Sequence, residues 1–355
     1  MKLNETHILR WGRFDEGYSR NRILHQCLRA RSCKVDNFKP RLSRWGDLEA
    51  FLRYVDDVDL IWVPCFRQRD LKAAVRWGRK KRIPVVFDPL ISAFDKQVFE
   101  RKKFTADSRK GKKLLAWESA LFQSVDLVIA DTCEHALFFQ ETLGVDPHKL
   151  AVVPVGAEEE LFRPSEQKCA DDSVPTVLFY GSFLNLQGPV TIVEAARRYS
   201  GPPVKWKMVG DGPLLEECRI SAKGLSNIEF LPWMPYEDLP KIICQADILL
   251  GVFGTSAKAG RVIPNKVYQA LACGKPLITS RSSAYPELFH NNDVLGIGWV
   301  DSGNSQQLAD KVAKLLSDRI GLVEMGTQAR QSYETYFSME MISASLFAAL
   351  RSLLP

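Results

Sequence analysis

The sequence predicts an α/β protein with two Rossmann-like domains, each a parallel sheet covered by helices. Short runs of β-branched and other apolar residues alternate with longer stretches of helical periodicity. The runs are apolar throughout, which is typical of strands buried on both faces. A polar, acidic stretch at 154–175 interrupts the alternation, and a chain of 355 residues is long enough for two domains.

The first domain takes its strands from the N-terminal part of the chain. One strand precedes the segment 11–20, and the others are expected at 60–63, 84–87, 127–130 and 150–153. The stretch 154–175 has no room for a helix with a buried face, which is why we interpret it as the connection between the domains. The first domain is placed at 1–160 and the linker at 161–175.

The second domain, placed at 176–338, repeats the pattern. Its strands are expected at 176–180, 205–209, 228–230, 248–252 and 276–279, with a helix from 190 to 199. Beyond the last strand, residues 339–354 space their apolar side chains as a helix, and we expect 339–355 to complete the first domain. Ligands of such folds bind in a crevice at the C-terminal ends of the strands, here expected between the domains.

Composition and motifs exclude several classes of protein. No apolar stretch approaches the ~18 residues that span a bilayer, and the N-terminal segment is charged. The protein is therefore expected to be cytoplasmic, either free or peripheral at the cytoplasmic face of a membrane. The 8 cysteines form no Cys-x-x-Cys pair and are expected to be reduced. The dinucleotide fingerprint, the P-loop and the nucleophile elbow are absent. Asp57 and Asp59 are either a metal-binding pair or, as we favour, turn and cap residues, so neither metal nor cofactor is expected.

Basic residues concentrate in one segment of the chain. The net charge is +6, and residues 67–113 hold 16 Lys and Arg against 5 Asp and Glu. This segment predicts an anionic partner, either a membrane surface or a nucleic acid. Because no aromatic stripe or recognition motif accompanies the charge, we favour an anionic membrane and expect no nucleic acid. A solvated basic surface is the alternative.

Loops after the strands of the second domain carry residues suited to phosphate and base. Glycine-containing turns follow the strands at 176–180 and 205–209, and each leads into a helix whose N–H groups can bind phosphate. Ordinary turn chemistry is the alternative. A rigid loop follows the strand at 228–230, where the indole of Trp233 either walls a flat pocket or packs inside. The candidate residues are Gly181, Ser182, Phe183, Gly210, Pro232, Trp233 and Met234.

The strongest pattern lies at 251–279. A strand ends in a Gly-rich loop with Arg261, and a helix opens near Pro264 with Lys266 in its first turn. Cations at a helix N-terminus oppose the helix dipole. Their placement is explained if an anion binds there, held by both side chains and by the free N–H groups of the helix. A solvated face is the alternative.

These segments together resemble the nucleotide-sugar-dependent glycosyltransferases of family 4 (glycosyl transferases group 1), over nearly the whole chain. The resemblance implies a GT-B fold and transfer of a sugar from a nucleoside diphosphate with retention at the anomeric carbon. The matching segments are VVPVGAEEELFRP (152–164), VLFYGSFLNLQG (177–188), VGDGPLLEE (209–217), IEFLPWMPYEDLP (228–240), ADILLGVF (246–253) and NKVYQALACGKPLIT (265–279).

The resemblance also implies roles for single residues in donor binding. The loop 232–234 would contact the base and Gln269 the ribose. Arg261, Asn265 and Lys266 would lie near the diphosphate or the donor sugar, where the two cations would stabilise the departing diphosphate without a metal. The family often has two glutamates at the positions of Arg261 and Gln269. It also often has two cations at the positions of Ser182 and Gln187, and the cations at 261 and 266 compensate for them.

In the first domain, the resemblance places a glycine-containing loop before a helix, facing the diphosphate and the acceptor. The loop residues are Gly12, Arg13, Tyr18, Ser19 and Arg20. Asp88 follows the strand at 84–87, and its carboxylate either positions or deprotonates an acceptor hydroxyl or is a cap residue before Pro89. Asp131 and Thr132 are further candidates near the acceptor.

The sequence therefore predicts a retaining hexosyltransferase that uses a nucleotide sugar in cell-surface polysaccharide or glycolipid synthesis. The acceptor would be a glycan or a lipid-linked molecule, and relatives with membrane acceptors suggest that 67–113 docks to anionic headgroups. A nucleotide-sugar 2-epimerase shares the architecture and is one alternative. A catalytically weak GT-B scaffold, suggested by the two missing glutamates, is the other.

Overall fold

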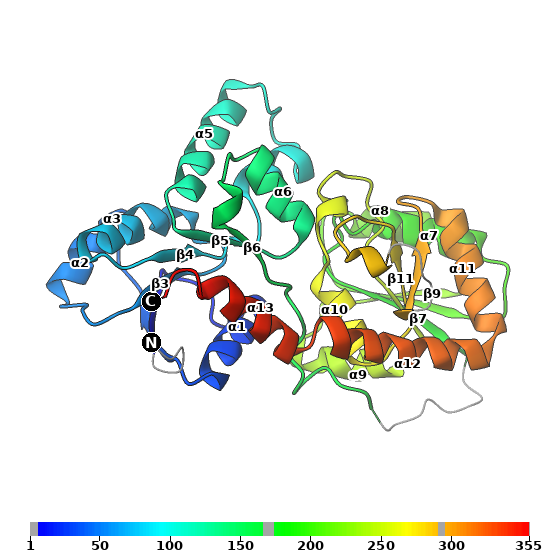
Figure 1. Cartoon of the computed structure of the whole chain (residues 1–355). Coiled ribbons are helices and arrows are strands. Elements are labelled where there is room, and N and C mark those ends of the chain that lie inside the picture. Colours follow the sequence, from blue (N-terminus) through cyan, green and yellow to red (C-terminus); the bar gives the residue numbers. More distant parts are fainter. Residues whose placement is uncertain (1–5, 166–173, 290–294, 355) are drawn as a thin grey trace. The chain divides into compact units, whose positions relative to one another are not determined.

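The structure is a computed structural model that describes residues 6–165, 174–289 and 295–354 (Figure 1). The chain divides into two compact units. The first comprises Met1–Gly156 together with Met339–Pro355, and the second comprises Ala157–Ser338. Most of the expected linker, 166–173, lies outside the described residues. Among the described helices, none is both long and apolar enough to cross a membrane.

The first unit is built on a parallel sheet that has six strands in the described residues, in the order β2-β1-β3-β4-β5-β6. The strands are β1 (His7–Trp11), β2 (Lys34–Phe38), β3 (Leu60–Val63), β4 (Val85–Phe87), β5 (Leu127–Ala130) and β6 (Leu150–Val152). β3, β4 and β5 are buried along their whole length, as expected for strands covered on both faces.

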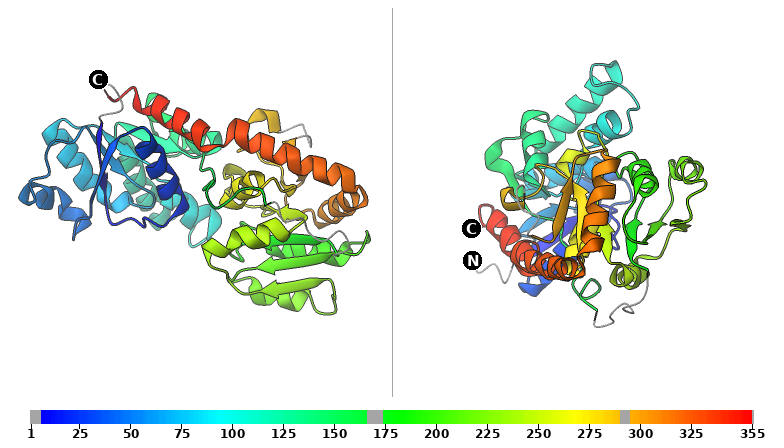
Figure 2. Two further views of the ribbon diagram at one scale, coloured as in Figure 1. Left: turned by 90° about the horizontal axis from the view of Figure 1, so that it is seen from below. Right: turned by 90° about the vertical axis from the view of Figure 1, so that its right-hand side faces the viewer.

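Helices cover both faces of this sheet (Figures 1 and 2). One apolar core joins the sheet to α2 (Gly46–Leu52), α3 (Leu71–Lys81), α5 (Arg109–Gln123) and α6 (Cys133–Glu141). A separate core joins it to α1 (Ser19–Ala30) and α13 (Met339–Leu350). The last helix expected from the sequence is therefore confirmed, and it packs on the first unit because its apolar residues complete this second core.

The second unit repeats this plan, with six described strands in the order β12-β11-β10-β7-β8-β9. They are β7 (Thr176–Tyr180), β8 (Lys205–Val209), β9 (Ile228–Leu231), β10 (Ile248–Leu250), β11 (Leu277–Ser280) and β12 (Ile297–Val300). The helices are α7 (Pro189–Arg198), α8 (Leu215–Ser221), α9 (Leu239–Gln245), α10 (Asn265–Ala272), α11 (Ser305–Ser317) and α12 (Arg319–Tyr336). The α/β class with parallel sheets is confirmed. The edge strands β2 and β12 were not expected from the sequence.

Candidate functional site

Two glycine turns approach each other closely at the C-terminal ends of β7 and β8. The backbone of Gly181 has φ +142° and that of Gly210 has φ +136°. A Cβ on Gly210 would lie 2.0 Å from the carbonyl oxygen of Gly181, so no other residue fits there without moving the backbone. The turns are tied together by hydrogen bonds from the Gly181 N–H to the Val209 carbonyl (3.0 Å) and from the Phe183 N–H to the Asp211 carbonyl (2.8 Å).

Lys266 reaches from the first turn of α10 into this end of the sheet. Its Nζ lies 3.9 Å from the ring centroid of Phe179 and would lie 3.2 Å from a Cβ on Gly181. The side chain is buried, and within the described residues its ammonium has no hydrogen-bond partner. Burial lowers the pKa of Lys266 well below its ordinary value. An anion bound beside Gly181 would give this ammonium the partner that it lacks.

A second buried polar atom without a hydrogen-bond partner in the described structure lies beside the same glycine. Gln187 Oε1 would be 4.0 Å from a Cβ on Gly181. Buried polar atoms in folded proteins are nearly all hydrogen-bonded, and exceptions call for an explanation. A donor and an acceptor left unpaired around one glycine turn indicate a polar ligand there.

Gln269 lies one turn further along α10, and each end of its amide makes a hydrogen bond within the protein. Its Oε1 accepts a hydrogen bond from the Tyr180 hydroxyl (2.8 Å), and its Nε2 donates to the Tyr236 hydroxyl (3.3 Å). The Tyr236 hydroxyl donates in turn to Glu158 Oε1 (2.9 Å). Burial raises the pKa of Tyr180 well above its ordinary value, so this hydroxyl remains a donor. The amide therefore joins β7, α10, the loop before α9 and the segment after β6.

The remaining candidates of the second unit differ in how accessible they are. Ser182, Arg261 and Asn265 are half-buried, with Arg261 on a turn before α10 and Asn265 at the first position of the helix. Phe183 is buried, and its ring packs against Phe179 and Phe230. Its side chain therefore belongs to the core, which leaves only its backbone for a ligand.

The loop after β9 presents an indole to solvent. Trp233 is 63% exposed, Pro232 is exposed, and Met234 is half-buried. Of the two roles considered for Trp233, packing in the interior is thereby excluded. An exposed aromatic face on a rigid loop is suited to stacking with a flat ring.

In the first unit, the loop between β1 and α1 has both exposed and buried members. Gly12 has φ +128°, and its N–H donates to the Phe38 carbonyl (2.9 Å). Arg13 is exposed, while Tyr18 is half-buried with its ring against Phe66. Ser19 at the start of α1 is buried, and its hydroxyl has no hydrogen-bond partner among the described residues, which marks a further unfilled polar position.

Arg20 and Asp88 form a buried ion pair. The guanidinium donates to the Asp88 carboxylate at 3.1–3.3 Å and to the carbonyls of Val153 (2.8 Å) and Pro154 (2.6 Å). The Cys65 thiol donates to the same carboxylate (3.5 Å). Asp88 therefore connects three strand ends, and a role with an acceptor hydroxyl would require this ion pair to open. Arg20 is likewise too buried to face an acceptor directly.

The two candidates after β5 help to fix a histidine. Thr132 caps α6 by accepting from the His135 N–H (3.1 Å), and Asp131 Oδ1 lies 2.5 Å from His135 Nδ1. On the other side of the ring, His135 Nε2 lies 3.9 Å from Asp95 Oδ2. All these groups are buried, and their arrangement is that of an internal polar cluster.

A metal site is not seen in the part of the chain that the structure describes. No group of three or more His, Cys, Asp or Glu is arranged there to hold an ion. The carboxylate of Asp59 instead accepts a hydrogen bond from the His7 N–H (2.8 Å) at the start of β1. This hydrogen bond ties the start of β1 to the residue before β3.

Sequence reasoning missed Tyr180, Tyr236 and Glu158. Tyr180 ends a strand and Tyr236 follows the rigid loop, both inside segments that the sequence singled out. Glu158 was assigned to the connection between the domains. Its neighbours in the sequence are acidic and give no local signal, because its partner Tyr236 lies 78 residues away.

Two family descriptions together match nearly the whole chain, one in each half. Residues 163–332 match "Glycosyl transferases group 1", and residues 12–156 match "Glycosyl transferase 4-like domain". The D-inositol 3-phosphate glycosyltransferase of Segniliparus rotundus is 28% identical over 68% of this chain and 55% of its own length. The amylovoran biosynthesis glycosyltransferase AmsK of Erwinia amylovora is 25% identical over 64% of this chain and 56% of its own length. The chain thus spans about half the length of the curated relatives it matches.

Solved structures show the same architecture. The Anabaena protein HepE in complex with UDP-glucose superposes with a TM-score of 0.73 at 17% identity, covering 98% of this chain and 100% of that one. Sucrose-phosphate synthase from Thermosynechococcus elongatus gives 0.72 at 17% identity, with 98% and 99% covered. Two parallel sheets of this kind and these neighbours give the chain a GT-B fold. The chain belongs to the group 1 glycosyltransferases, with the family 4-like domain in its N-terminal half.

Proposed function

We propose that this protein transfers a hexose from a nucleoside-diphosphate sugar, with retention of anomeric configuration, to a glycan or lipid-linked acceptor in polysaccharide or glycolipid synthesis. Relatives named as D-inositol 3-phosphate and amylovoran biosynthesis glycosyltransferases support this class of reaction. Structural neighbours in complex with UDP and UDP-glucose support a nucleotide-sugar donor. The second unit would bind the donor and the first unit the acceptor.

The observation that carries the proposal is the unpaired Lys266 ammonium at the Gly181 turn. A diphosphate there supplies the counter-ion that the fold lacks, next to the N–H groups of a helix start. Gln187 Oε1 would then accept a hydrogen bond from a hydroxyl of the nucleotide sugar that carries this diphosphate. The exposed indole of Trp233 is available to the base.

Lys266 would act on the leaving group. As the bond between the anomeric carbon and the diphosphate oxygen breaks, negative charge grows on the diphosphate, and a preorganised ammonium in a dry site stabilises that charge more than it stabilises the ground state. The acceptor oxygen forms the new bond to the anomeric carbon, and its proton leaves with the diphosphate. Arg261 would add a second cation, and no cofactor enters this reaction.

Gln269 favours a second candidate, the catalytically weak GT-B scaffold. Its amide bonds both Tyr180 and Tyr236 and is buried, so a ribose would have to reach the remaining hydrogen or lone pair of the amide in the interior. A scaffold would keep the fold and release no nucleoside diphosphate. Donor turnover separates the two functions.

The basic segment 67–113 supports a peripheral position at the cytoplasmic face of a membrane, where a lipid-linked acceptor would lie. Its charge would attract anionic headgroups at about 1 kcal/mol for each well-placed Lys or Arg. Binding of this kind weakens with salt.

Calorimetric titration with UDP, GDP, ADP and dTDP tests the donor site directly. We expect one of them to bind the wild type and to bind Lys266→Met far more weakly. Lys275→Met is the matched control, since Lys275 follows α10 at its other end and donates to the Cys244 carbonyl. Binding of none by the folded protein would contradict the donor site. With the matching donor, NMR of the product shows whether the anomeric configuration is retained.

A further inference from the structure

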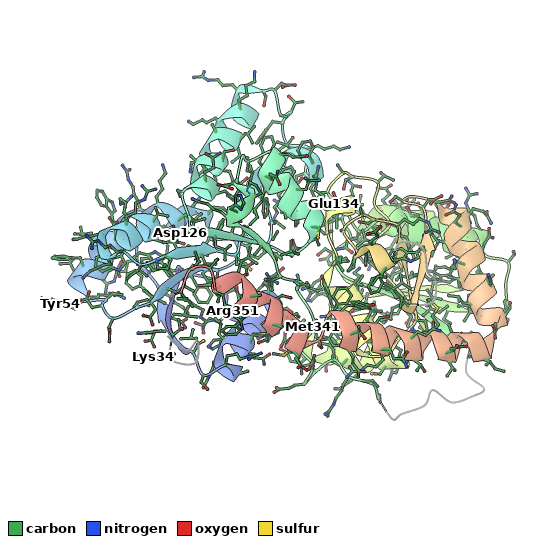
Figure 3. The ribbon with its side chains drawn as sticks, viewed as in Figure 1. Lys34, Tyr54, Asp126, Glu134, Met341 and Arg351 are labelled. Atoms are coloured by element: carbon green, nitrogen blue, oxygen red, sulfur yellow. The ribbon has the colours of Figure 1, made fainter. Side chains whose placement is uncertain are left out.

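A ridge of large apolar side chains on the first unit lies in solvent. It comprises Leu42 (62% exposed), Trp45 (54%), Leu48 (52%), Phe51 (55%), Leu52 (66%) and Tyr54 (86%). Figure 3 labels Tyr54, which extends outward at this end of the unit. Isolated exposed apolar residues are common on proteins, but a group of large ones gathered between residues 42 and 54 indicates an interaction site.

Helix α2 in this ridge has the reverse of the usual pattern. Its residues buried against the unit are the small Gly46 and Ala50, whereas Leu48, Phe51 and Leu52 face away. A helix that serves only the core would bury its large residues. The fold therefore holds α2 by its small face and leaves the large one for a partner.

A basic stripe on α3 adjoins the ridge. The helix buries Leu71, Ala73, Ala74, Val75, Trp77 and Gly78. Its exposed positions include Lys72, Arg76, Arg79 and Lys80, all cationic. Arg76 bonds Asp47 (2.6–2.7 Å) and the Arg44 carbonyl (2.7 Å), which fixes α2 beside α3. Lys80 Nζ lies 4.6 Å from the Phe51 ring centroid, so the two surfaces meet.

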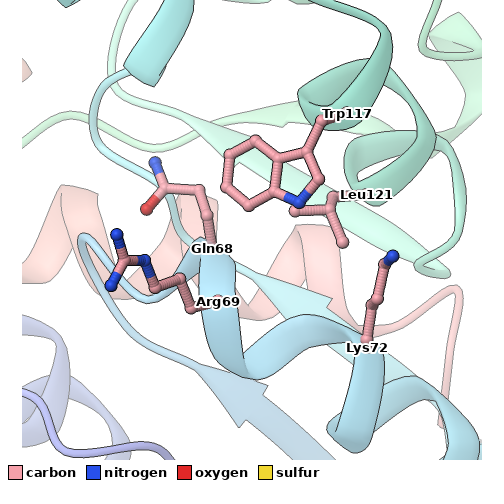
Figure 4. Close-up of a pocket in the computed structure, with 5 residues that line it drawn as sticks. All are labelled: Gln68, Arg69, Lys72, Trp117 and Leu121. Atoms are coloured by element: carbon pink, nitrogen blue, oxygen red, sulfur yellow. The ribbon is translucent and has the colours of Figure 1, made fainter. Parts of the chain in front are cut away.

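A pocket of about 400 Å³ opens between the start of α3 and α5 (Figure 4). Trp117 and Leu121 of α5 give it an apolar wall, and Arg69 and Lys72 lie across from them. Within the described residues, neither cation has an acidic side chain within ion-pair distance. Two unpaired cations beside an indole suit a phosphate carried on an organic group.

We infer that the first unit docks on an anionic lipid bilayer by inserting the ridge at 42–54 among the headgroups, with the α3 stripe over them and a lipid phosphate in the pocket. This docking rests on the membrane contact proposed above for 67–113. It adds an apolar contact through the ridge at 42–54, which lies outside that segment. Apolar insertion combined with basic attraction is the usual means of stable interfacial binding. A second copy of this chain fits less well, because pairing two ridges would bring two basic stripes together.

Co-sedimentation with vesicles tests this docking. Wild-type protein is mixed with neutral vesicles and with vesicles of about one-third anionic phospholipid, at ~0.1 M and ~1 M salt. The ridge variant carries Leu48→Ser, Phe51→Ser and Leu52→Ser, and the stripe variant carries Lys72→Glu, Arg79→Glu and Lys80→Glu. The control is Ile320→Ser with Val323→Ser, which removes even more exposed apolar side chains from α12 in the second unit.

We expect the wild type and the control to bind anionic vesicles and the ridge variant to bind at least ~10-fold less at either salt concentration. The stripe variant should lose binding mainly at low salt. Failure of the wild type to bind anionic vesicles would overturn the inference, as would unchanged binding by the ridge variant. So would a wild-type dimer that only the ridge variant dissociates. Nucleotide titration of the ridge variant, expected to match the wild type, separates failure of docking from failure of the proposed donor site.

Discussion

Replacing Lys266 by Met should stabilise the protein and weaken nucleotide binding. The ammonium is buried without a hydrogen-bond partner in the described structure, so the cation–π contacts with Phe179 (3.9 Å to the ring centroid) and Tyr180 (5.7 Å) are left to offset its desolvation cost. Methionine has a similar length and no charge. Replacement of buried charged groups by apolar ones of similar volume is often stabilising by about 1–4 kcal/mol. Since each kcal/mol raises the melting temperature of a unit of this size by about 2–4 °C, thermal unfolding detects the effect.

The cost of the same substitution should appear in nucleotide affinity. A hydrogen bond to a charged group contributes about 1.5–3 kcal/mol, and its loss corresponds to about 10- to 150-fold weaker binding in calorimetry. Lys275→Met should show the opposite behaviour, with lower stability and unchanged affinity, because its ammonium is satisfied by the Cys244 carbonyl. A Lys266→Met protein that is less stable and binds as tightly as wild type would refute the reasoning.

The lowered pKa of Lys266 sets the direction in which stability and nucleotide affinity change with pH. The pKa of Lys266 is lowered by burial in the folded protein, so on acidification the unfolded chain takes up its proton first. Stability should therefore fall as the pH drops from the ordinary lysine pKa toward the lowered one, and this slope should be absent in Lys266→Met. A bound diphosphate favours the charged form and raises the pKa. Binding should then be accompanied by proton uptake, measured as a dependence of the binding enthalpy on the buffer, and affinity should fall as the pH rises through the lowered pKa.

Three further substitutions test the geometry. Gly210→Ala should cost at least ~3 kcal/mol of unfolding free energy and abolish nucleotide binding, because the new Cβ would lie 2.0 Å from the Gly181 carbonyl oxygen. Gly224→Ala, with φ +82° and nothing within 4 Å, should cost only ~1–2 kcal/mol, so equal losses in chemical denaturation would contradict the close approach. Asp88→Asn should cost about 3–5 kcal/mol by leaving Arg20 buried without its counter-ion. Unchanged stability with lost turnover would instead support the acceptor role.

The central strands were predictable from the sequence because their burial is visible in composition. β3, β5 and β10 have neighbours on both sides and helices on both faces, so every residue is apolar. β2 lies at a sheet edge, pairs only with β1 and reads KVDNF, a polar pattern without the apolar run. β12 lies at the edge of the other sheet and contains Gly298. β2 therefore lacks the apolar run because most of its residues are exposed, whereas β12 is buried throughout and was missed because Gly298 interrupts its apolar residues.

For the candidate site, the position of a residue along the fold was more predictable from the sequence than the side chains around it. The dipole argument placed Lys266 in the first turn of a helix that follows a strand, and α10 confirms this placement. The Lys266 side chain is buried against Phe179, which lies 87 residues earlier in the sequence. The two side chains meet because the strand order of the sheet places β7 near α10. Asp88 illustrates the opposite case, since nothing near it in the sequence indicates Arg20 as its partner.

Gln269 is the position where the long-range partners explain a departure from the resemblance. Its Nε2 supplies the hydrogen that the Tyr236 hydroxyl accepts, which leaves that hydroxyl free to donate to Glu158. A glutamate at 269 cannot donate when ionised, so Gln269→Glu would place two carboxylates around one tyrosine proton.

We expect Gln269→Glu to lower the unfolding free energy by about 1–3 kcal/mol, since one buried polar group loses its partner. Because burial and a nearby carboxylate raise the pKa of the new acid in the folded protein, its stability should fall as the pH rises through the pKa of an unfolded glutamate. Adding Glu158→Gln restores a donor at the other end of the chain of hydrogen bonds and should recover most of the loss. A double-mutant cycle at neutral pH with no coupling between positions 158 and 269 would show that the glutamine is not held by this network.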